Sequence, residues 1–153
     1  MDSLLDRLCL LLFAAQMTCD RRLLAASSLF AGASAFGSVT AIRHGIPGQP
    51  LGVSIPLSVS AGVRVGWGAG IAAPWPMPMS ALIAAATTSR GQPSTARGTV
   101  CVGLGLGCLA GTLVEPVTYR PTTWPPAVRA AIMLNIAASV ALAAAGWRHL
   151  RSR

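Results

Sequence analysis

The sequence predicts an all-α integral membrane protein, built as a compact bundle of about four transmembrane helices after an N-terminal amphipathic or short extra helix. Composition is the first reason: charged residues make up 10% of the 153-residue chain, hydrophobic residues 53%, and the mean hydropathy is +0.60. A soluble domain carries roughly 25% charged residues to solvate its surface. The second reason is that four apolar segments reach the length of about 20 residues with which a helix crosses a bilayer.

One transmembrane domain is predicted over residues 21–150, and each of its spans ends at charged residues or at proline and glycine clusters. The spans cover residues 23–42, 63–88, 99–118 and about 127–147. The second is the least regular, because three alternate prolines within residues 73–79 cannot donate to a helix ladder. The helix must break there or begin near Met79, and in the latter case residues 51–73 could supply a span of their own.

The segments outside these spans are assigned from their polarity and leucine spacing. Residues 1–20 carry leucines on one helical face, which is typical of an amphipathic helix lying on a membrane. The alternatives are a short span fused to the first one, or a true start at Met17 instead of Met1. Residues 43–62 are rich in proline and glycine, and we expect an interfacial or re-entrant stretch there. Residues 151–153 form a basic cytoplasmic tail.

The arginines predict the orientation. All twelve basic residues are arginine, which together with the alanine, glycine and proline content indicates a bacterium with a GC-rich genome. Four spans place eight arginines on one side of the membrane (Arg7, Arg21, Arg22, Arg90, Arg97, Arg148, Arg151 and Arg153) and four on the other (Arg43, Arg64, Arg120 and Arg129). The positive-inside rule then puts both termini in the cytoplasm, in a multi-pass protein of the cell membrane. Because the arginines are scattered between apolar segments, no nucleic-acid partner is expected.

Glycines recur at every fourth residue in two of the predicted spans. The run GLGLG at residues 103–107 lacks the GxGxxG spacing of a dinucleotide-binding loop, and the chain has no lysine for a phosphate-binding loop. Small residues at intervals of four instead let two helix backbones approach closely in lipid. The sequence therefore predicts glycine-zipper packing, with the participating residues Gly103, Gly107 and Gly111 in the third span and Gly62, Gly66 and Gly70 in the second.

Glu115 is the only acidic residue beyond position 20 and the first candidate for a site. The predicted third span places it inside the outer leaflet, where an ionised carboxylate needs a partner and a lone one takes up a proton. Pro116 follows directly and disfavours helical geometry at Glu115. The candidate partners on the same predicted side are Arg64, Tyr119, Arg120 and Arg129. Three interpretations stay open: a structural Glu–Arg pair, a site for an anionic or amphiphilic ligand such as a lipid head group, and proton-coupled transport.

Asn135, near the middle of the fourth span, is the second candidate. An amide in hydrocarbon hydrogen-bonds to a neighbouring helix, or it lines a cavity. The broken stretch at residues 73–79 is the third candidate, since broken helices line binding sites in transporters. No catalytic residue, metal site or cofactor is predicted, because no second carboxylate, His–Ser pair or ligand cluster accompanies Glu115.

These features predict a non-enzymatic small membrane protein. Its expected partners are the lipid bilayer, a second copy or another membrane protein that packs against it, and a lipid or amphiphile bound at the outer face. The alternative is a small transporter or channel-like subunit that uses Glu115 and the proline-broken second span. An enzyme is the least favoured class, because the chain offers few acid–base groups.

Overall fold

The computed structural model describes residues 20–65, 68–86, 95–119 and 124–152. Within these ranges three helices are long and apolar enough to cross a membrane, namely α2 (Arg21–His44), α5 (Thr95–Leu113) and α6 (Pro126–Arg151). They correspond to the predicted spans 23–42, 99–118 and 127–147. The predicted N-terminal helix lies outside the described residues.

Both ends of α2 follow from local sequence. At its start the Asp20 Oδ1 atom accepts hydrogen bonds from the backbone N–H groups of Arg22 at 3.1 Å and Leu23 at 3.2 Å, and so caps the helix. At its end Gly45 adopts a left-handed φ of 63°, which glycine reaches without the steric cost that a Cβ brings. The chain therefore leaves the helix directly after His44.

The second predicted span, within residues 63–88, is broken. Two short helices replace it, α3 (Val59–Val65) and α4 (Pro76–Ala86). α4 has 11 residues and so covers about 16 Å, roughly half of a hydrocarbon core of about 30 Å. The four-span count therefore does not follow from helix lengths alone. In the described part of residues 51–73 the longest helix is the seven-residue α3, so no separate span forms there.

A tight turn occupies the break before α4. Gly68 has a positive φ of 76°, and a Cβ at this position would lie 2.2 Å from the Ala72 carbonyl oxygen. Ala69 and Ala72 then form an isolated antiparallel bridge, and α4 begins at Pro76. Pro74 precedes α4, and Pro76 and Pro78 lie in its first turn, where the N–H groups that proline lacks have no partner within the helix. The interruption therefore lies ahead of the prolines, between Val65 and Pro76, and α4 begins before Met79.

α5 ends at Leu113, and Glu115 lies just beyond it rather than inside it. The following 3₁₀ turn η2 (Pro116–Tyr119) supplies side-chain donors to the exposed carbonyls of the last helical turn. Thr118 Oγ1 donates to the Thr112 carbonyl at 2.6 Å, and the Tyr119 hydroxyl donates to the Leu113 carbonyl. These bonds satisfy acceptors that every helix C-terminus leaves free, and they fix the backbone that carries Glu115.

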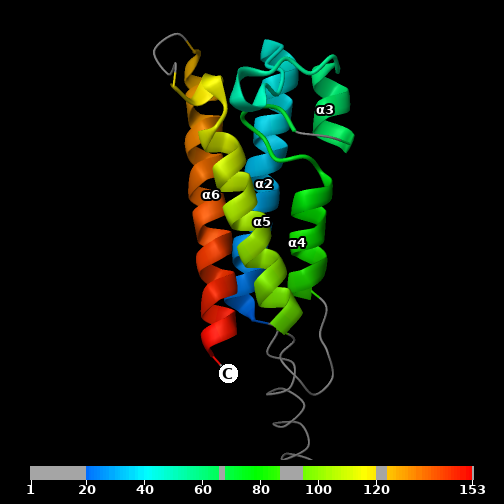
Figure 1. Cartoon of the computed structure of the whole chain (residues 1–153). Coiled ribbons are helices and arrows are strands. Elements are labelled where there is room, and N and C mark those ends of the chain that lie inside the picture. The colour runs from blue at the N-terminus through cyan, green and yellow to red at the C-terminus, as the bar shows by residue number, and fades with distance from the viewer. Residues whose placement is uncertain (1–19, 66–67, 87–94, 120–123, 153) are drawn as a thin grey trace, which may run out of the picture.

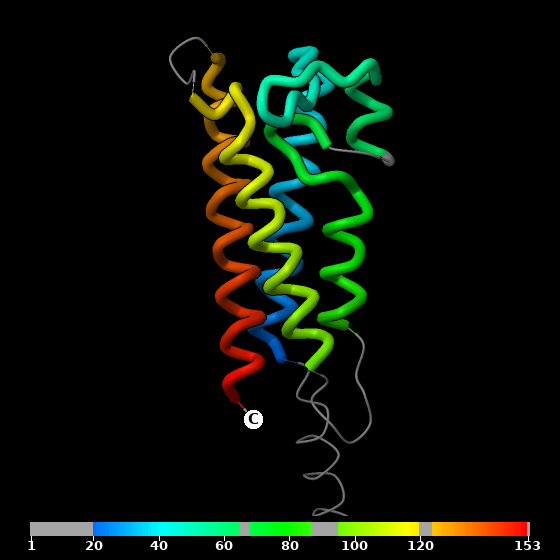
Figure 2. The backbone as a smooth tube through the Cα atoms, viewed as in Figure 1, coloured from blue at the N-terminus to red at the C-terminus, as the bar shows by residue number. Residues whose placement is uncertain are grey.

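The helices form one bundle (Figure 1). α6 packs against α5 and α2, and α4 packs against α2 and α5. The start of α2 and the end of α6 lie at the same end of the bundle, drawn at the bottom, while α3, η1 (Pro50–Gly52) and the loop between them lie at the other. The tube view shows the same loop folded over the upper end of the bundle (Figure 2). The stretch expected to be interfacial or re-entrant, residues 43–62, is therefore largely this covering loop.

The core consists of two clusters of buried apolar side chains. The cluster toward the lower end includes Leu23, Phe30, Ala81, Cys101 and Leu142, and the cluster toward the upper end includes Ala41, Ile46, Ile71, Val128 and Ile132. The turn before α4 contributes to both clusters, because Ala69 and Ile71 belong to the upper one and Ala73 to the lower one. The broken segment is thus part of the packed interior.

Glycines do bring α5 and α6 together, but they are not the predicted ones. A Cβ on Gly105 would lie 2.7 Å from both the Ala143 nitrogen and the Ser139 carbonyl oxygen, and one on Gly146 would lie 2.8 Å from the Gly98 carbonyl oxygen. These contacts belong to the face of α5 that also buries Cys101 and Cys108. Close helix approach in lipid depends on such small residues.

The strip predicted in the third span faces away from α6. A Cβ on Gly103 or Gly111 would meet no atom within 4 Å, and one on Gly107 would touch only the Met77 Cε of α4, at 3.9 Å. These three glycines therefore do not bring α5 against α6, and the predicted glycine-zipper packing is not confirmed among the described residues. The orientation of α5 about its axis buries Gly105 and Cys108 and leaves Leu106 53% exposed.

The strip predicted in the second span does not form on one helix. Gly62 lies in α3, Gly70 lies in the turn before α4, and Gly66 is outside the described residues. A Cβ on Gly62 would lie 2.8 Å from the Gly68 carbonyl oxygen. The helix α3 ends at Val65 and a turn with a positive φ at Gly68 follows, so the regular 3.6-residue repeat on which the prediction relied is lost between Gly62 and Gly70.

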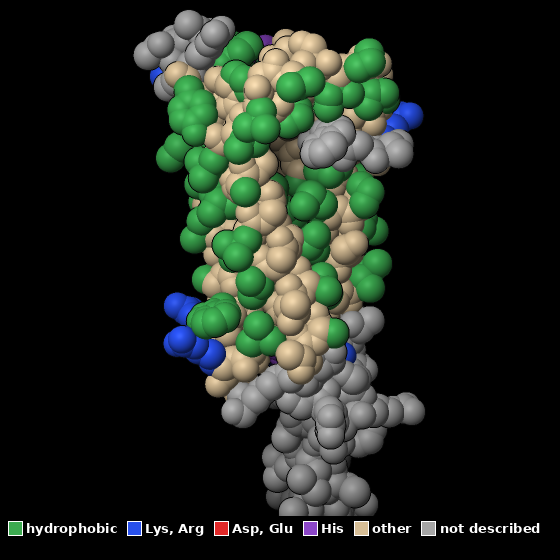
Figure 3. Space-filling model, viewed as in Figure 1, with side chains coloured by type: hydrophobic (Ala, Val, Ile, Leu, Met, Phe, Trp, Pro, Cys, Tyr) green, Lys and Arg blue, Asp and Glu red, His purple; other side chains and the backbone are tan. Residues whose placement is uncertain are grey.

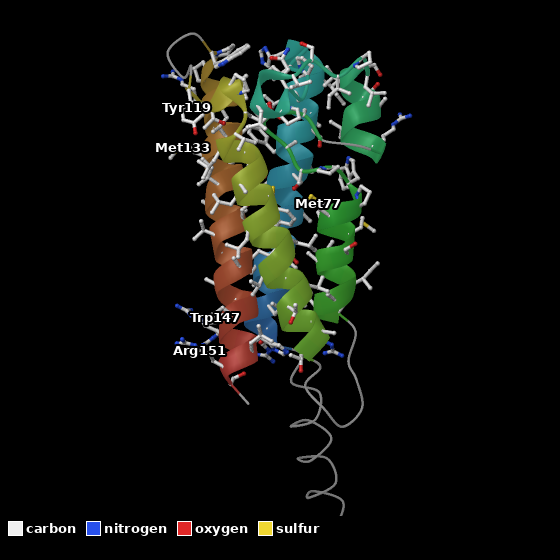
Figure 4. All side chains as sticks on the ribbon, in the orientation of Figure 1. Met77, Tyr119, Met133, Trp147 and Arg151 are labelled. Atoms are coloured by element: carbon white, nitrogen blue, oxygen red, sulfur yellow. The ribbon has the colours of Figure 1, made fainter. Side chains whose placement is uncertain are left out.

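The middle of the bundle is apolar on its outside. Hydrophobic side chains cover this part of the face shown in Figure 3, and the arginine side chains lie toward the two ends. Figure 4 shows Trp147 and Arg151 projecting from the lower end of α6, where the guanidinium carbon lies 4.9 Å from the indole centroid. An aromatic ring beside a cation is typical of the boundary between hydrocarbon and head groups.

Candidate functional site

Glu115 is held where three segments meet beyond the upper end of α5. Glu115 is 4% exposed. It is one of only four acidic residues in the chain, and it is buried. Both carboxylate oxygens accept the backbone N–H of Gln49, at 3.1 and 2.9 Å. Gly48 and Gly70 line the carboxylate, since a Cβ on Gly70 would lie 2.9 Å from Oε2 and one on Gly48 would lie 3.7 Å from Oε1. Glycine at position 70 lets the backbone come this close to the acid, whereas the distance of 3.7 Å at Gly48 is an ordinary van der Waals contact.

The predicted Glu–Arg pair is not formed by the described arginines. Arg64 and Arg129 are exposed, and neither makes an ion pair with Glu115; Arg120 lies outside the described residues. Tyr119 is 69% exposed, and its hydroxyl is bonded to the Leu113 carbonyl. Arg64 sits on α3, which lies apart from α5 (Figure 1), so of the expected partners the three described ones, Arg64, Tyr119 and Arg129, are all exposed.

The environment of Glu115 favours its neutral form. Burial raises the pKa of the carboxyl above its ordinary value of 4.5, and the hydrogen bond from Gln49 lowers it only in part. The described residues give this carboxylate no counter-cation, and the one hydrogen bond from Gln49 replaces only part of the hydration that burial removes. Glu115 is therefore a group that takes up a proton more readily than an exposed glutamate does.

Asn135 connects α6 to α5 from within the core. Its Nδ2 donates to Thr112 Oγ1 at 2.7 Å, and Thr112 Oγ1 donates in turn to the Cys108 carbonyl at 2.9 Å. The Cys108 thiol lies 3.7 Å from Asn135 Oδ1 and closes the ring of contacts. Asn135 is 1% exposed, so a hydrogen bond between helices, the first of the two alternatives for this amide, is present.

Asn135 also meets the second alternative, because it lines a cavity. A partly open pocket of about 280 Å³ lies between α5, the turn before α4 and η1. We call it the Glu115 pocket, and its walls are formed by Pro50, Ala69, Gly70, Ala72, Ala73, Pro74, Met77, Gly107, Cys108, Gly111, Thr112, Val114, Glu115 and Asn135. Most of these residues are apolar or glycine, and the polar groups come from α5, its end and α6. The volume lies just below the usual range of small-molecule sites, about 300–1,000 Å³.

The pocket brings together the three candidates that the sequence suggests separately. Glu115, Asn135 and the broken stretch at residues 73–79 contribute to the same walls. Figure 4 shows Met77 at the upper end of α4, directed toward the bundle, which places it on the pocket side. Gly107 and Gly111, which face away from α6, leave open the space that side chains would otherwise fill.

Several residues of the site carry no sequence signal that would have identified them. Gln49 acts through its backbone N–H, which every non-proline residue possesses. Thr112 and Cys108 are recognisable only in hindsight, as polar residues four apart on one helical face. At the opposite end of the bundle the Nδ1 atom of His149 lies 2.9 Å from Asp20 Oδ2, a contact between residues that no motif connects.

The described residues hold no group of three or more histidine, cysteine or acidic side chains that could bind a metal ion. The free thiols of Cys101 and Cys108 are buried. No protein-family model, curated protein or solved structure matches this chain.

Proposed function

We propose that this chain is a multi-pass protein of a bacterial cell membrane that binds the apolar body of an amphiphile in the Glu115 pocket. The observation that carries the proposal is the convergence of Glu115 and Asn135 on one partly open apolar cavity. Ligand sites are mostly apolar, with a few polar groups that orient the ligand. Catalysis is less favoured, because the described wall residues include one carboxyl and one thiol but no third group placed as their acid–base partner.

The proposed topology has four crossings. α2 rises from the lower end, the chain returns through the broken α3–α4 segment, α5 rises again and α6 returns (Figure 1). The described arginines at the lower end are Arg21, Arg22, Arg97, Arg148 and Arg151, and those at the upper end are Arg43, Arg64 and Arg129. This bias favours a cytoplasmic lower end and places the Glu115 pocket in the outer half.

Cysteine labelling tests this topology. Ser54→Cys lies in the upper loop and Ser152→Cys follows the lower end of α6, and both native serines are exposed. With Cys9 and Cys19 replaced by serine, a membrane-impermeant maleimide added to intact cells should label the first variant and not the second. Labelling of both from outside would contradict the four-crossing arrangement.

Filling the pocket tests the binding function. Gly111→Leu places a side chain where no atom lies within 4 Å of the added Cβ, and Gly103→Leu adds the same group to the same helix away from the pocket. Binding of 1-decanol is measured by native mass spectrometry from a nonionic detergent. Gly111→Leu should weaken binding at least about tenfold, since roughly 100 Å² of lost apolar contact is worth about 2.5 kcal/mol, and Gly103→Leu should bind as the original chain does. Equal binding by both variants would overturn the proposal.

A small transporter is the second candidate. The break between α3 and α4 favours it, because discontinuous helices line the substrate sites of many transporters. Proteoliposomes containing a pH-sensitive dye distinguish the two functions under an applied membrane potential. Transport through Glu115 predicts a proton flux that Glu115→Gln abolishes, whereas binding alone predicts the permeability of protein-free liposomes.

A further inference from the structure

We infer that the Glu115 pocket selects an amphiphile with a primary or secondary ammonium head group, whose N–H donors complete the hydrogen bonding of the Glu115 carboxylate. The inference rests on the proposed binding function and names its ligand class. The structure supplies three grounds for it: the unused acceptor capacity of the carboxylate, the charges around it, and the composition of the pocket walls.

The carboxylate has more acceptor capacity than its neighbours use. A carboxylate offers about four lone-pair sites, and the described residues supply one donor, the Gln49 N–H, which the two oxygens share. At 4% exposure water has little access to the remaining sites. A ligand that brings N–H donors replaces hydration that the fold has removed, as charge-assisted hydrogen bonds do in buried sites.

The charges around Glu115 favour a cation over an anion. Arg64 of α3 and Arg129 of α6 are exposed and unpaired with it. Among the described residues that line the pocket, the other titratable group is the Cys108 thiol; the Tyr119 hydroxyl, four residues after Glu115, is bonded to a backbone carbonyl. An anionic head group would therefore meet a like charge and no described guanidinium, which disfavours phosphate or carboxylate ligands.

The walls distinguish between kinds of cation. Quaternary ammonium groups have no N–H and are held mainly by aromatic faces, and none of the described residues that line the pocket is aromatic. Apolar surfaces from Ala73, Met77 and Val114 suit an alkyl chain. The volume of about 280 Å³ equals roughly nine water molecules at about 30 Å³ each, which is enough for a head group and the first part of a chain whose remainder lies in lipid.

Four ten-carbon probes in the same native mass spectrometry assay test the inference: decylamine, decyltrimethylammonium, 1-decanol and decanoate. At pH 8 the original chain should bind decylamine more tightly than the other three. Glu115→Gln should weaken decylamine binding about tenfold to hundredfold, the effect of losing a hydrogen bond to a charged group, and leave 1-decanol unchanged. Up to about pH 9 the binding of decylamine should also strengthen with rising pH, because an alkylammonium with a pKa of about 10.4 stays almost fully protonated in this range and only the ionised carboxylate attracts it.

The two proposals fail separately. If Gly111→Leu weakens 1-decanol binding but Glu115→Gln leaves decylamine binding unchanged, the pocket function stands and the ammonium preference is overturned. Binding of decanoate as tight as that of decylamine would also overturn the ammonium preference and leave the pocket function standing. If Gly111→Leu alters the binding of no probe, the pocket function and the head-group inference both fall.

Discussion

His149 Nδ1 lies 2.9 Å from Asp20 Oδ2, so that residues 129 positions apart close the lower end of the bundle. Asp20 also caps α2 through its other carboxylate oxygen. One side chain thus begins the first described helix and fastens it to the last one. The Nε2 atom of His149 is buried and without a described hydrogen-bond partner. The contact with Asp20 is therefore the polar interaction that holds the imidazole ring in place.

Replacing Asp20 should destabilise the bundle in two separable steps. Asp20→Ala removes both the cap and the contact with His149 and should lower the free energy of unfolding by about 1–2 kcal/mol. Asp20→Asn keeps a capping side chain and should lose less. Thermal unfolding in detergent at neutral pH measures both, and equal stability of all three chains would contradict this role of Asp20.

The charge of Asp20 also predicts a pH dependence. Burial alone would raise the pKa of Asp20, but hydrogen bonds from His149, Leu23 and Arg22 lower it below its ordinary value of 3.8. The contribution of the charge to stability is therefore complete above pH 3.8 and disappears as the pH falls through the lowered pKa. The stability difference between the original chain and Asp20→Asn should shrink below that pH, and a difference that grows there would have the wrong sign.

Two glycines on α5 should respond to alanine with opposite signs. In Gly105→Ala the new Cβ would lie 2.7 Å from two backbone atoms of α6, so the helices must separate, at a cost of about 1–3 kcal/mol. In Gly103→Ala the Cβ meets nothing within 4 Å, and the higher helix propensity of alanine should stabilise the fold by up to about 1 kcal/mol. Unfolding in mixed detergent micelles compares them. A larger loss of stability in Gly103→Ala than in Gly105→Ala would mean that α5 packs against α6 through the face that carries Gly103, which contradicts the structure.

The Asn135–Thr112 bond should appear as a coupling energy. Asn135→Ala and Thr112→Val each remove one partner of the 2.7 Å contact, and the double variant removes both. Hydrogen bonds between transmembrane helices couple by about 0.6 kcal/mol on average and up to about 1.7, and full burial places this one toward the upper value. A double-mutant cycle measures it, and strictly additive losses would show that the two side chains act independently.

The sequence predicts the elements of this fold better than their contacts. Hydropathy and the prolines identify α2, α5, α6 and the broken segment, because length, apolarity and missing N–H groups are local properties. Which face of α5 packs against α6 is not a local property, because glycines lie on both sides of the helix. Gly105 and Gly103 differ in whether atoms of α6 lie close to them. The two long-range polar contacts, Asp20 with His149 and Gln49 with Glu115, join residues far apart in sequence. No sequence motif identifies either pair.

The candidate site was predicted in its parts and not in its assembly. Glu115 and Asn135 stand out because ionisable and amide groups are rare in apolar segments. That they share one cavity depends on how the turn before α4 folds onto α5. The expected arginine partners were inferred from their side of the membrane alone, which does not fix the direction of a side chain.

The ionisation of Glu115 tests the central claim most directly, and the chain suits the measurement because Glu115 is its sole glutamate. Incorporation of glutamate labelled with ¹³C at the carboxyl carbon gives one titrating glutamate resonance from the protein in lipid nanodiscs. We predict a midpoint above the ordinary 4.5, moved to lower pH by decylamine and unmoved by 1-decanol. A midpoint at or below 4.5 in the free protein would contradict a buried carboxyl in an apolar pocket.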